Sequence, residues 1–226
     1  NNKKSIRFAL SAIKGVGLSS MTKLVAERNN GGLFTNIIDF MSRFNSEVIN
    51  KRQIEKLIQA GAFDSIFENR SLLFNNVINF VNIFGGVQSN IDNQSNLFND
   101  EKINFNDKKI FNHDVNDWTL DLKLKYELEV VGFYFSDHPL SNYPKNFFRT
   151  INVMNYNQIL KNNEIRTAKI VGSILDIKER SNKDGKKYAF ITISNQENQF
   201  EMSIFNDTIS KYKNLLKEGN VLLFNA

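Results

Sequence analysis

The chain has 226 residues, with 29 lysines and arginines against 24 aspartates and glutamates, a formal net charge of +5 and an isoelectric point near 9.2. It has no cysteine, which excludes disulfides and cysteine-based zinc or redox sites and suits a reducing cytoplasmic compartment. No apolar run approaches the roughly 18 residues of a membrane span, so we expect no membrane association. The length suits two domains, and the basic excess is compatible with nucleic acid without establishing it.

Residues 1–84 have the apolar spacing of helices. Apolar residues recur every three or four positions on both sides of a short turn, which predicts one helix before the turn and another after it. These residues are Ile6, Leu10, Ile13, Met21, Leu24 and Val25. Further helices are predicted near 37–41, at 51–60 and at 71–84, with Ser71 as the N-cap of the last.

The turn between the first two helices is the first candidate site. Glycine allows a positive φ and a close approach of another backbone, and the amides at the start of the following helix attract anions. The candidate phosphate-binding residues are Lys14, Gly15, Val16, Gly17, Ser19 and Lys23. A plain helix–helix turn is the alternative, because any tight αα-hairpin favours glycine. A degenerate second copy at 48–63 is expected to pack the fold rather than touch DNA.

Residues 85–117 change character. They are rich in Asn, Asp and Ser and show neither a helical nor an alternating period, which is typical of a flexible linker. One island, Gln94-Ser95-Asn96-Leu97-Phe98, places two large apolar residues in this polar segment. Residues 118–163 predict a helical connector, with helices at 118–128 and near 157–160.

Residues 164–226 switch to a period of two, which is typical of strands. Strands are predicted at 165–177, 187–194 and 199–205, followed by a helix at 207–217 and the start of another strand after 219–220. Gly172 indicates a bend or bulge in the first strand, and Asn182-Lys183-Asp184-Gly185 indicates a hairpin turn. This is the order of an OB-fold barrel that lacks its final strand. The predicted fold class is therefore multi-domain: an all-α domain, a linker and a partial all-β OB barrel.

The first hairpin of the barrel is the second candidate site, because lysines and an aromatic residue gather there. A base stacked on an exposed ring gains roughly 1–3 kcal/mol, and cations attract the backbone. The candidate residues for single-stranded DNA are Lys178, Arg180, Lys183, Lys186, Lys187 and Tyr188. Alternation does not decide whether Phe190 and Phe200 are core, and we expect at least half of the aromatics to be core. His113 and His138 have no partners at ligand spacing, so no metal site is predicted, and no catalytic motif is visible.

The glycine turn resembles the hairpin of the helix-hairpin-helix family. This resemblance implies sequence-independent binding of a duplex-DNA phosphate through backbone amides. It also implies a monovalent-cation site, which would fall on Gly15 and Gly17.

Three ranges, 6–17, 50–64 and 127–140, resemble the alpha-subunit family of bacterial DNA polymerase III, in its region after the catalytic palm. The resemblance covers almost the whole chain apart from the linker, and 127–140 is its most specific part. It implies that the full-length protein is a DNA-directed DNA polymerase, a nucleotidyltransferase of DNA replication. Its magnesium-binding carboxylates would lie upstream, so this portion would be non-catalytic and hold no cofactor.

The same resemblance gives the linker island a role as a clamp-binding peptide. Gln94 would supply amide contacts to a sliding clamp, and Leu97 and Phe98 would be the buried anchors. The implied partners are duplex primer–template DNA, single-stranded template DNA, the sliding clamp and other replicase subunits. Two alternatives stay open: a non-enzymatic helix-hairpin-helix and OB subunit of a repair or recombination complex, and a structural interaction fragment whose glycines only make a turn.

Overall fold

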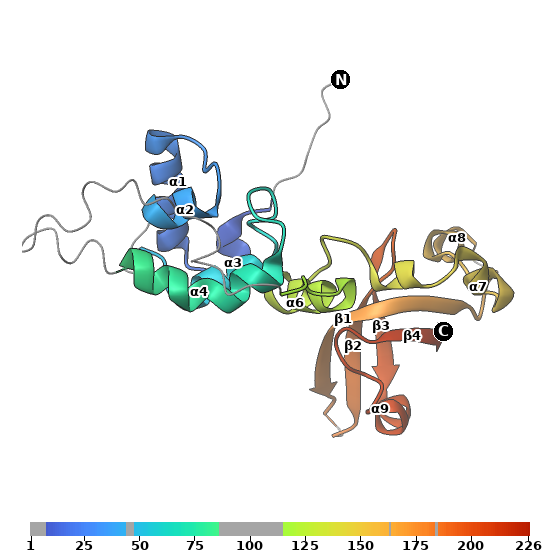
Figure 1. Cartoon of the computed structure of the whole chain (residues 1–226). Helices are drawn as coiled ribbons and strands as arrows, with labels where there is room; N and C mark the ends of the chain where they lie inside the picture. Colours follow the sequence, from blue (N-terminus) through green and yellow to red (C-terminus); the bar gives the residue numbers. More distant parts are fainter. Residues whose placement is uncertain (1–7, 44–47, 86–114, 163, 184) are drawn as a thin grey trace, which may run out of the picture. The chain divides into compact units, whose positions relative to one another are not determined.

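The computed structural model describes residues 8–43, 48–85, 115–162, 164–183 and 185–226. The chain divides into two compact units, Asn1–Val131 and Gly132–Ala226 (Figure 1). The boundary falls inside residues 118–163, which the sequence suggested as one connector. The helix at their start belongs to the first unit, and the remainder belongs to the second. Each unit has its own hydrophobic core.

The first unit is helical. Its elements are η1 (Leu10–Ala12), α1 (Leu18–Gly31), α2 (Ile37–Arg43), α3 (Lys51–Gln59), α4 (Arg70–Gly85) and α6 (Leu120–Val131). α3 begins at a capping box, in which the Gln53 amide donates to Asn50 Oδ1 and the Gln53 side chain accepts from the Asn50 amide. It ends at Gly61, whose φ of +76° suits the left-handed position after a helix. The predicted helices near 37–41 and at 51–60 and 118–128 are confirmed.

Two sequence-based expectations for this unit are wrong. The described residues before the glycine turn form only the 3₁₀ turn η1, because Ile13 is extended and the Lys14 amide donates to the Val130 carbonyl at 2.8 Å instead of closing a helical turn. The N-cap of α4 is Asn69 rather than Ser71. The Leu72 amide donates to Asn69 Oδ1 at 2.8 Å, which starts the helix one residue before Ser71.

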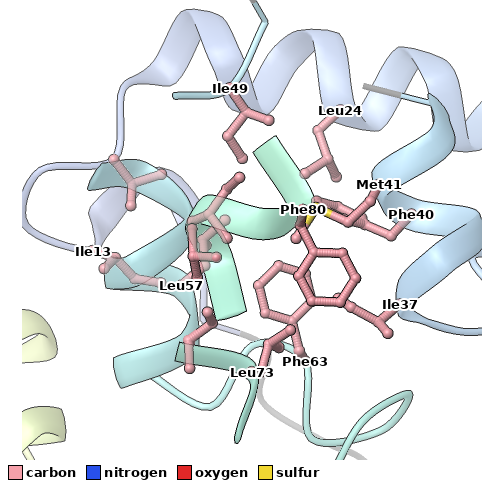
Figure 2. Close-up of a cluster of buried hydrophobic side chains, with 14 of the residues drawn as sticks. Ile13, Leu24, Ile37, Phe40, Met41, Ile49, Leu57, Phe63, Leu73 and Phe80 are labelled. Carbon is pink, nitrogen blue, oxygen red and sulfur yellow. The ribbon is translucent and has the colours of Figure 1, made fainter. Parts of the chain in front are cut away.

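The core of the first unit is rich in phenylalanine (Figure 2). The rings of Phe40 and Phe63 meet edge to face, with their centroids 4.8 Å apart, and Phe80 of α4 is fully buried beside them. Burial of one such side chain stabilises the fold by roughly 1.5–3 kcal/mol. Ile13 of the glycine turn belongs to the same core, so the turn is anchored to the rest of the unit.

The second unit is built on a four-stranded antiparallel sheet. Three short helices, η2 (Pro139–Asn142), α7 (Lys145–Thr150) and α8 (Tyr156–Lys161), precede β1 (Lys169–Ser181), β2 (Lys187–Ser194), β3 (Gln199–Phe205), α9 (Asn206–Tyr212) and β4 (Val221–Asn225). The strand order is β3-β2-β1-β4, and the sheet curls into a half-barrel consistent with a partial OB fold. The predicted order of elements along the chain (three strands, a helix and a fourth strand), the hairpin turn at 182–185 and the short helix near 157–160 are confirmed. The expected first strand lies four residues too early, and α9 ends at Tyr212 because the chain then enters tight turns.

β1 is bent, as Gly172 indicated. Its first residues pair with β4, its later residues pair with β2, and the β2 pairing shifts register between Ile174 and Asp176. A Cβ on Gly172 would lie 2.3 Å from Ile193 Cγ2 and 2.7 Å from the Ser194 carbonyl oxygen. Glycine at this position therefore allows β1 and β2 to approach where the sheet curls.

Candidate nucleic-acid interface

The first hairpin, residues 13–17, is a tight turn fixed by two apolar anchors. Ile13 and Val16 are buried, and the Val16 amide donates to the Ile13 carbonyl at 3.0 Å. Gly15 has a φ of +84°, in the region that glycine occupies without strain. Because the anchors point inward, Lys14, Gly15 and Gly17 lie on the surface, and Val16 can offer a ligand only its backbone.

The helix that follows has an open N-terminus. Gly17 is its N-cap, with φ of −77° and ψ of 142°, and has no side chain to accept from the first-turn amides. The first turn contains no acidic residue, and Leu18 and Ser19 are exposed. Orphan amides and the positive end of the helix dipole therefore face solvent at the place predicted from the sequence. Lys23 is exposed in the next turn of α1.

The start of α3 lies beside this open helix end. The Ser20 hydroxyl donates to Gln53 Oε1 at 3.3 Å, while Gln53 Nε2 lies 3.1 Å from Ser20 Oγ. A Cβ on Gly17 would lie 3.4 Å from Gln53 Nε2, and one on Gly15 would lie 3.5 Å from Lys56 Cγ. The first residues of α3 thus lie next to the first hairpin, a proximity that the sequence alone did not predict.

The second hairpin, residues 60–69, has the same left-handed glycine but a filled interior. The Arg70 guanidinium donates to Asp64 Oδ2 at 2.6 Å and to the fully buried Glu127 Oε1 at 2.9 Å. Burial alone would lower the pKa of Arg70, but its bonds with Asp64 and Glu127 raise it above the ordinary value. A Cβ on Gly61 would lie only 2.2 Å from Arg70 Nη2. The space behind this glycine therefore holds the protein's own cation.

The first amides of α4, which follows the second hairpin, are also occupied. Asn69 accepts from the Leu72 amide, and the Asp117 carboxylate accepts from the Ser71 amide at 3.1 Å. Burial would raise the pKa of Asp117, but its Lys123 partner and the amides of Ser71 and Trp118 hold it below 3.8. An ionised carboxylate therefore sits at this helix start, which leaves no anion site there. The geometry agrees with the expectation that the second copy packs the fold.

One face of the sheet gathers cations and aromatic rings. Antiparallel partners share a face, and the register pairs Lys178 of β1 with Phe190 of β2, and Arg180 with Tyr188, which in turn pairs with Phe205 of β3. Phe205 is 69% exposed. We call these five residues the aromatic–basic face.

The predicted single-strand site residues divide between this face and the turn at its end. Lys178, Arg180 and Tyr188 lie together on it, whereas Lys183 and Lys186 lie in the hairpin turn at its end and Lys187 has the opposite strand parity. Phe200 is core and stacks on Tyr156, but Phe190 is not core, because Ala189 and Ile191 take the inward positions. Phe205 was not among the predicted residues, although it follows the buried Ile204 directly and adjacent residues of a strand point to opposite faces.

The remaining residues singled out from the sequence are those of the clamp-binding peptide and the two histidines. Gln94, Leu97 and Phe98 of the clamp-binding peptide, and His113, lie outside the described residues. His138 is structural: its Nδ1 accepts from the Leu140 amide at 3.1 Å, and its Nε2 lies 3.0 Å from Ser194 Oγ. Burial lowers the pKa of His138, although Asp137 and Ser194 act in the opposite sense.

Neither a metal cluster nor a membrane helix is found in the part of the chain that the structure describes. No group of three or more histidines or carboxylates among these residues could hold a metal ion. None of the helices in the described ranges combines the length and the hydropathy needed to cross a bilayer.

The chain resembles known proteins both in its first unit and over almost its whole length. Residues 1–73 match the model of the helix-hairpin-helix motif, so the first unit carries this motif. The curled sheet of the second unit is consistent with a partial OB fold. The chain is also similar to a protein named DNA polymerase III subunit alpha in several bacteria. It is 32% identical to the protein of Campylobacter jejuni and 31% identical to that of Neisseria meningitidis, in each case over 98% of this chain. It is 29% identical to that of Borreliella burgdorferi over 96% of this chain.

These matches confirm the resemblance inferred from the sequence. They cover 18% of the Campylobacter protein and 19% of the other two, so the chain spans about a fifth of the length of the curated relatives it matches.

Proposed function

We propose that this chain is the DNA-binding and clamp-tethering portion of a replicative DNA-directed DNA polymerase, that it acts in the cytoplasm, and that it performs no catalytic step itself. The observation that carries the proposal is the open N-terminus of α1 behind a glycine hairpin, in a chain whose relatives are named DNA polymerase III subunit alpha. The magnesium-binding carboxylates of the reaction would be supplied by residues outside this chain. No feature of the described residues specifically favours the repair or recombination alternative.

The first hairpin would hold a phosphate of the primer–template duplex. The amides from Gly17 to Ser19 point at solvent and would donate to phosphate oxygens, while Lys14 and Lys23 would add attraction. Such contacts position a duplex without reading its sequence, which suits an enzyme that moves along any template. A monovalent cation at Gly15 and Gly17 would need only backbone atoms, and both glycines are exposed.

A double substitution tests this grip. Gly15→Leu with Gly17→Leu should weaken duplex binding at low salt by tenfold or more, measured by fluorescence anisotropy, with folding checked by circular dichroism. Gly17→Leu alone keeps an allowed backbone angle and serves if the double variant does not fold. Unchanged affinity in a folded variant would rule out the first hairpin as a phosphate site.

The aromatic–basic face would bind the single-stranded template. Tyr188, Phe190 and Phe205 offer rings for base stacking, Lys178 and Arg180 attract the backbone, and the turn lysines Lys183 and Lys186, with Lys187, extend the positive charge. Phe205→Ala should weaken oligothymidine binding by about 1–3 kcal/mol. Phe147→Ala, at another exposed aromatic residue of the same unit, is the matched control and should leave affinity unchanged. Equal losses in both variants would argue against this face.

The clamp contact rests on Gln94, Leu97 and Phe98 and on the names of the relatives. Replacing Leu97 and Phe98 by alanine should abolish retention on an immobilised sliding clamp, while DNA binding stays intact. Retained clamp binding would refute the assignment. Nucleotide incorporation by the chain alone should be absent, and measurable incorporation would refute the non-catalytic role. Contacts with other replicase subunits belong to the same proposal.

A further inference from the structure

We propose that Lys51 and Arg52, at the start of α3, extend the phosphate-binding surface of the first hairpin along the same DNA strand, so that the first unit holds a duplex by one strand only. This inference rests on the proposed duplex binding by the first hairpin. Lys51 and Arg52 lie outside the first hairpin, and their contacts would determine which strand of the duplex is held.

The structure places these two residues beside the first hairpin. Gln53 follows them directly, and its side chain contacts Ser20 and would contact a Cβ on Gly17. Lys51 and Arg52 are both exposed. Lys51 has only a loose partner on its own helix, Glu55 at 3.5 Å, and Arg52 has no ion pair or side-chain hydrogen bond among the described residues. Both cations are therefore available to an external anion.

Their position in the helix is unfavourable without such an anion. A cation in the first turn of a helix meets the positive end of the helix dipole, which is unfavourable. The first turn of α3 contains Lys51 and Arg52 and no acidic residue. The first turn of α1 contains no acidic residue either. Two neighbouring helix starts thus lack acidic residues, and that of α3 also carries two cations, an arrangement that a bound phosphodiester backbone would stabilise.

The second hairpin does not offer a comparable site for a phosphate. Its helix start is capped by Asn69 and by the Asp117 carboxylate, and Arg70 is already neutralised by Asp64 and Glu127. A phosphate there would meet carboxylates and occupied amides. A duplex seated on the first hairpin would therefore find its second set of contacts at α3, along the same strand, rather than at the second hairpin across the duplex.

Two measurements test the inference. Lys51→Ala with Arg52→Ala should lower duplex affinity by about tenfold at low salt and reduce the slope of log affinity against log salt by about 2, since each lost phosphate contact removes about 0.9. Arg28→Ala removes one charge from the last turn of α1, away from the open end, and should leave the slope unchanged.

The strand is identified with a duplex in which one strand has uncharged methylphosphonate linkages. The first hairpin must then use the charged strand, so the double variant should lose the same factor on this duplex as on ordinary DNA. If the loss disappears, Lys51 and Arg52 contact the opposite strand and the inference is wrong. If the double variant loses nothing on either duplex while Gly17→Leu still weakens binding, only the inference fails. If Gly17→Leu has no effect, the proposed duplex grip fails.

Discussion

The two hairpins of the first unit share a left-handed glycine and differ in their interiors. Each turns on a glycine with positive φ, Gly15 at +84° and Gly61 at +76°, and each is followed by a long helix. In the first hairpin the amides at the helix start have no side-chain cap. In the second they are capped by Asn69 and Asp117, and Arg70 fills the space behind the glycine.

The difference teaches that a glycine turn is not sufficient for an anion site. Function depends on whether the chain leaves the helix amides open or satisfies them itself, because an amide that already donates to a carboxylate has no bond left for a phosphate. The first hairpin thus leaves its helix amides open, whereas the second satisfies them within the protein. The following changes test this difference by altering the interior of the second hairpin or the helix cap of the first.

Removal of the buried carboxylate of the second hairpin should have the largest effect. Glu127→Leu leaves the 4%-exposed Arg70 side chain without its fully buried ionic partner, and loss of one member of such a pair costs about 3–5 kcal/mol of unfolding free energy. Guanidinium chloride unfolding followed by circular dichroism measures the loss. Lys125→Ala, on the exposed side of α6, is the control and should leave stability unchanged. Equal stability of Glu127→Leu and wild type would mean that the ion pair is dispensable.

Alanine at Gly15 and at Gly61 should have the next largest effect, a difference in stability between the two variants. Both positions have positive φ, which costs an alanine about 1–2 kcal/mol. At Gly61 the new methyl group would also clash with Arg70, whereas at Gly15 the nearest atom is Lys56 Cγ at an ordinary 3.5 Å. Gly61→Ala should therefore be less stable than Gly15→Ala by at least about 1 kcal/mol, as expected for overpacking. Thermal denaturation checks the order, and the reverse order would contradict the filled interior of the second hairpin.

The first hairpin can be given the character of the second by adding a cap. Gly17 has the backbone angles of an N-cap, so Gly17→Asp and Gly17→Asn should both fold and satisfy a first-turn amide of α1. Gly17→Asp should weaken duplex binding by about tenfold, equivalent to about 1.4 kcal/mol, because its carboxylate also repels phosphate. Gly17→Asn, the uncharged match, should weaken it less. Similar losses in both variants would show that amide capping, and not charge, decides.

A fall in pH should have the smallest of these effects, a loss of the stability that Asp117 gives to the second hairpin. The pKa of Asp117 lies below its unfolded value of 3.8, so its contribution to stability is complete above about pH 4 and is lost as the pH falls through the folded value. We expect a decline of about 1 kcal/mol, the size of one N-cap. Asp117→Asn should flatten this part of the pH–stability profile. A profile with the same slope in both proteins would assign the acid sensitivity to other carboxylates.

Much of the fold could be predicted from the sequence, because local patterns specified it. The period-two alternation marked the strands, and Gly172 and the turn at 182–185 marked the bend and the hairpin. The absence of an α-helix at residues 8–13, the described part of the segment before the glycine turn, could not be predicted in this way. The Lys14 amide is taken by the carbonyl of Val130, a residue far away in the sequence, and a tertiary bond of this kind leaves no trace in a local period.

The candidate sites also differ in whether they depend on local sequence or on tertiary contacts. The open end of α1 could be predicted, since it depends only on Gly15 to Ser19 and on the absence of a capping side chain at Gly17. The aromatic–basic face was seen only in part, because the face to which Phe190 and Phe205 belong depends on the strand register. The proximity of α3 to the first hairpin could not be predicted, since Gln53 and Ser20 meet only in three dimensions.

The double pairing of β1 has a consequence for the order in which the barrel assembles. β2 follows β1 directly, so their hairpin closes a short loop, whereas the pairing of β4 with β1 closes a much longer loop that contains β2, β3 and α9. The half of β1 that pairs with β4 would therefore spend part of the folding time as an open strand edge, the kind of surface at which chains misassemble. Pulse-labelling hydrogen exchange during refolding would detect this order as late protection of Val221–Asn225 relative to the β1–β2 hairpin.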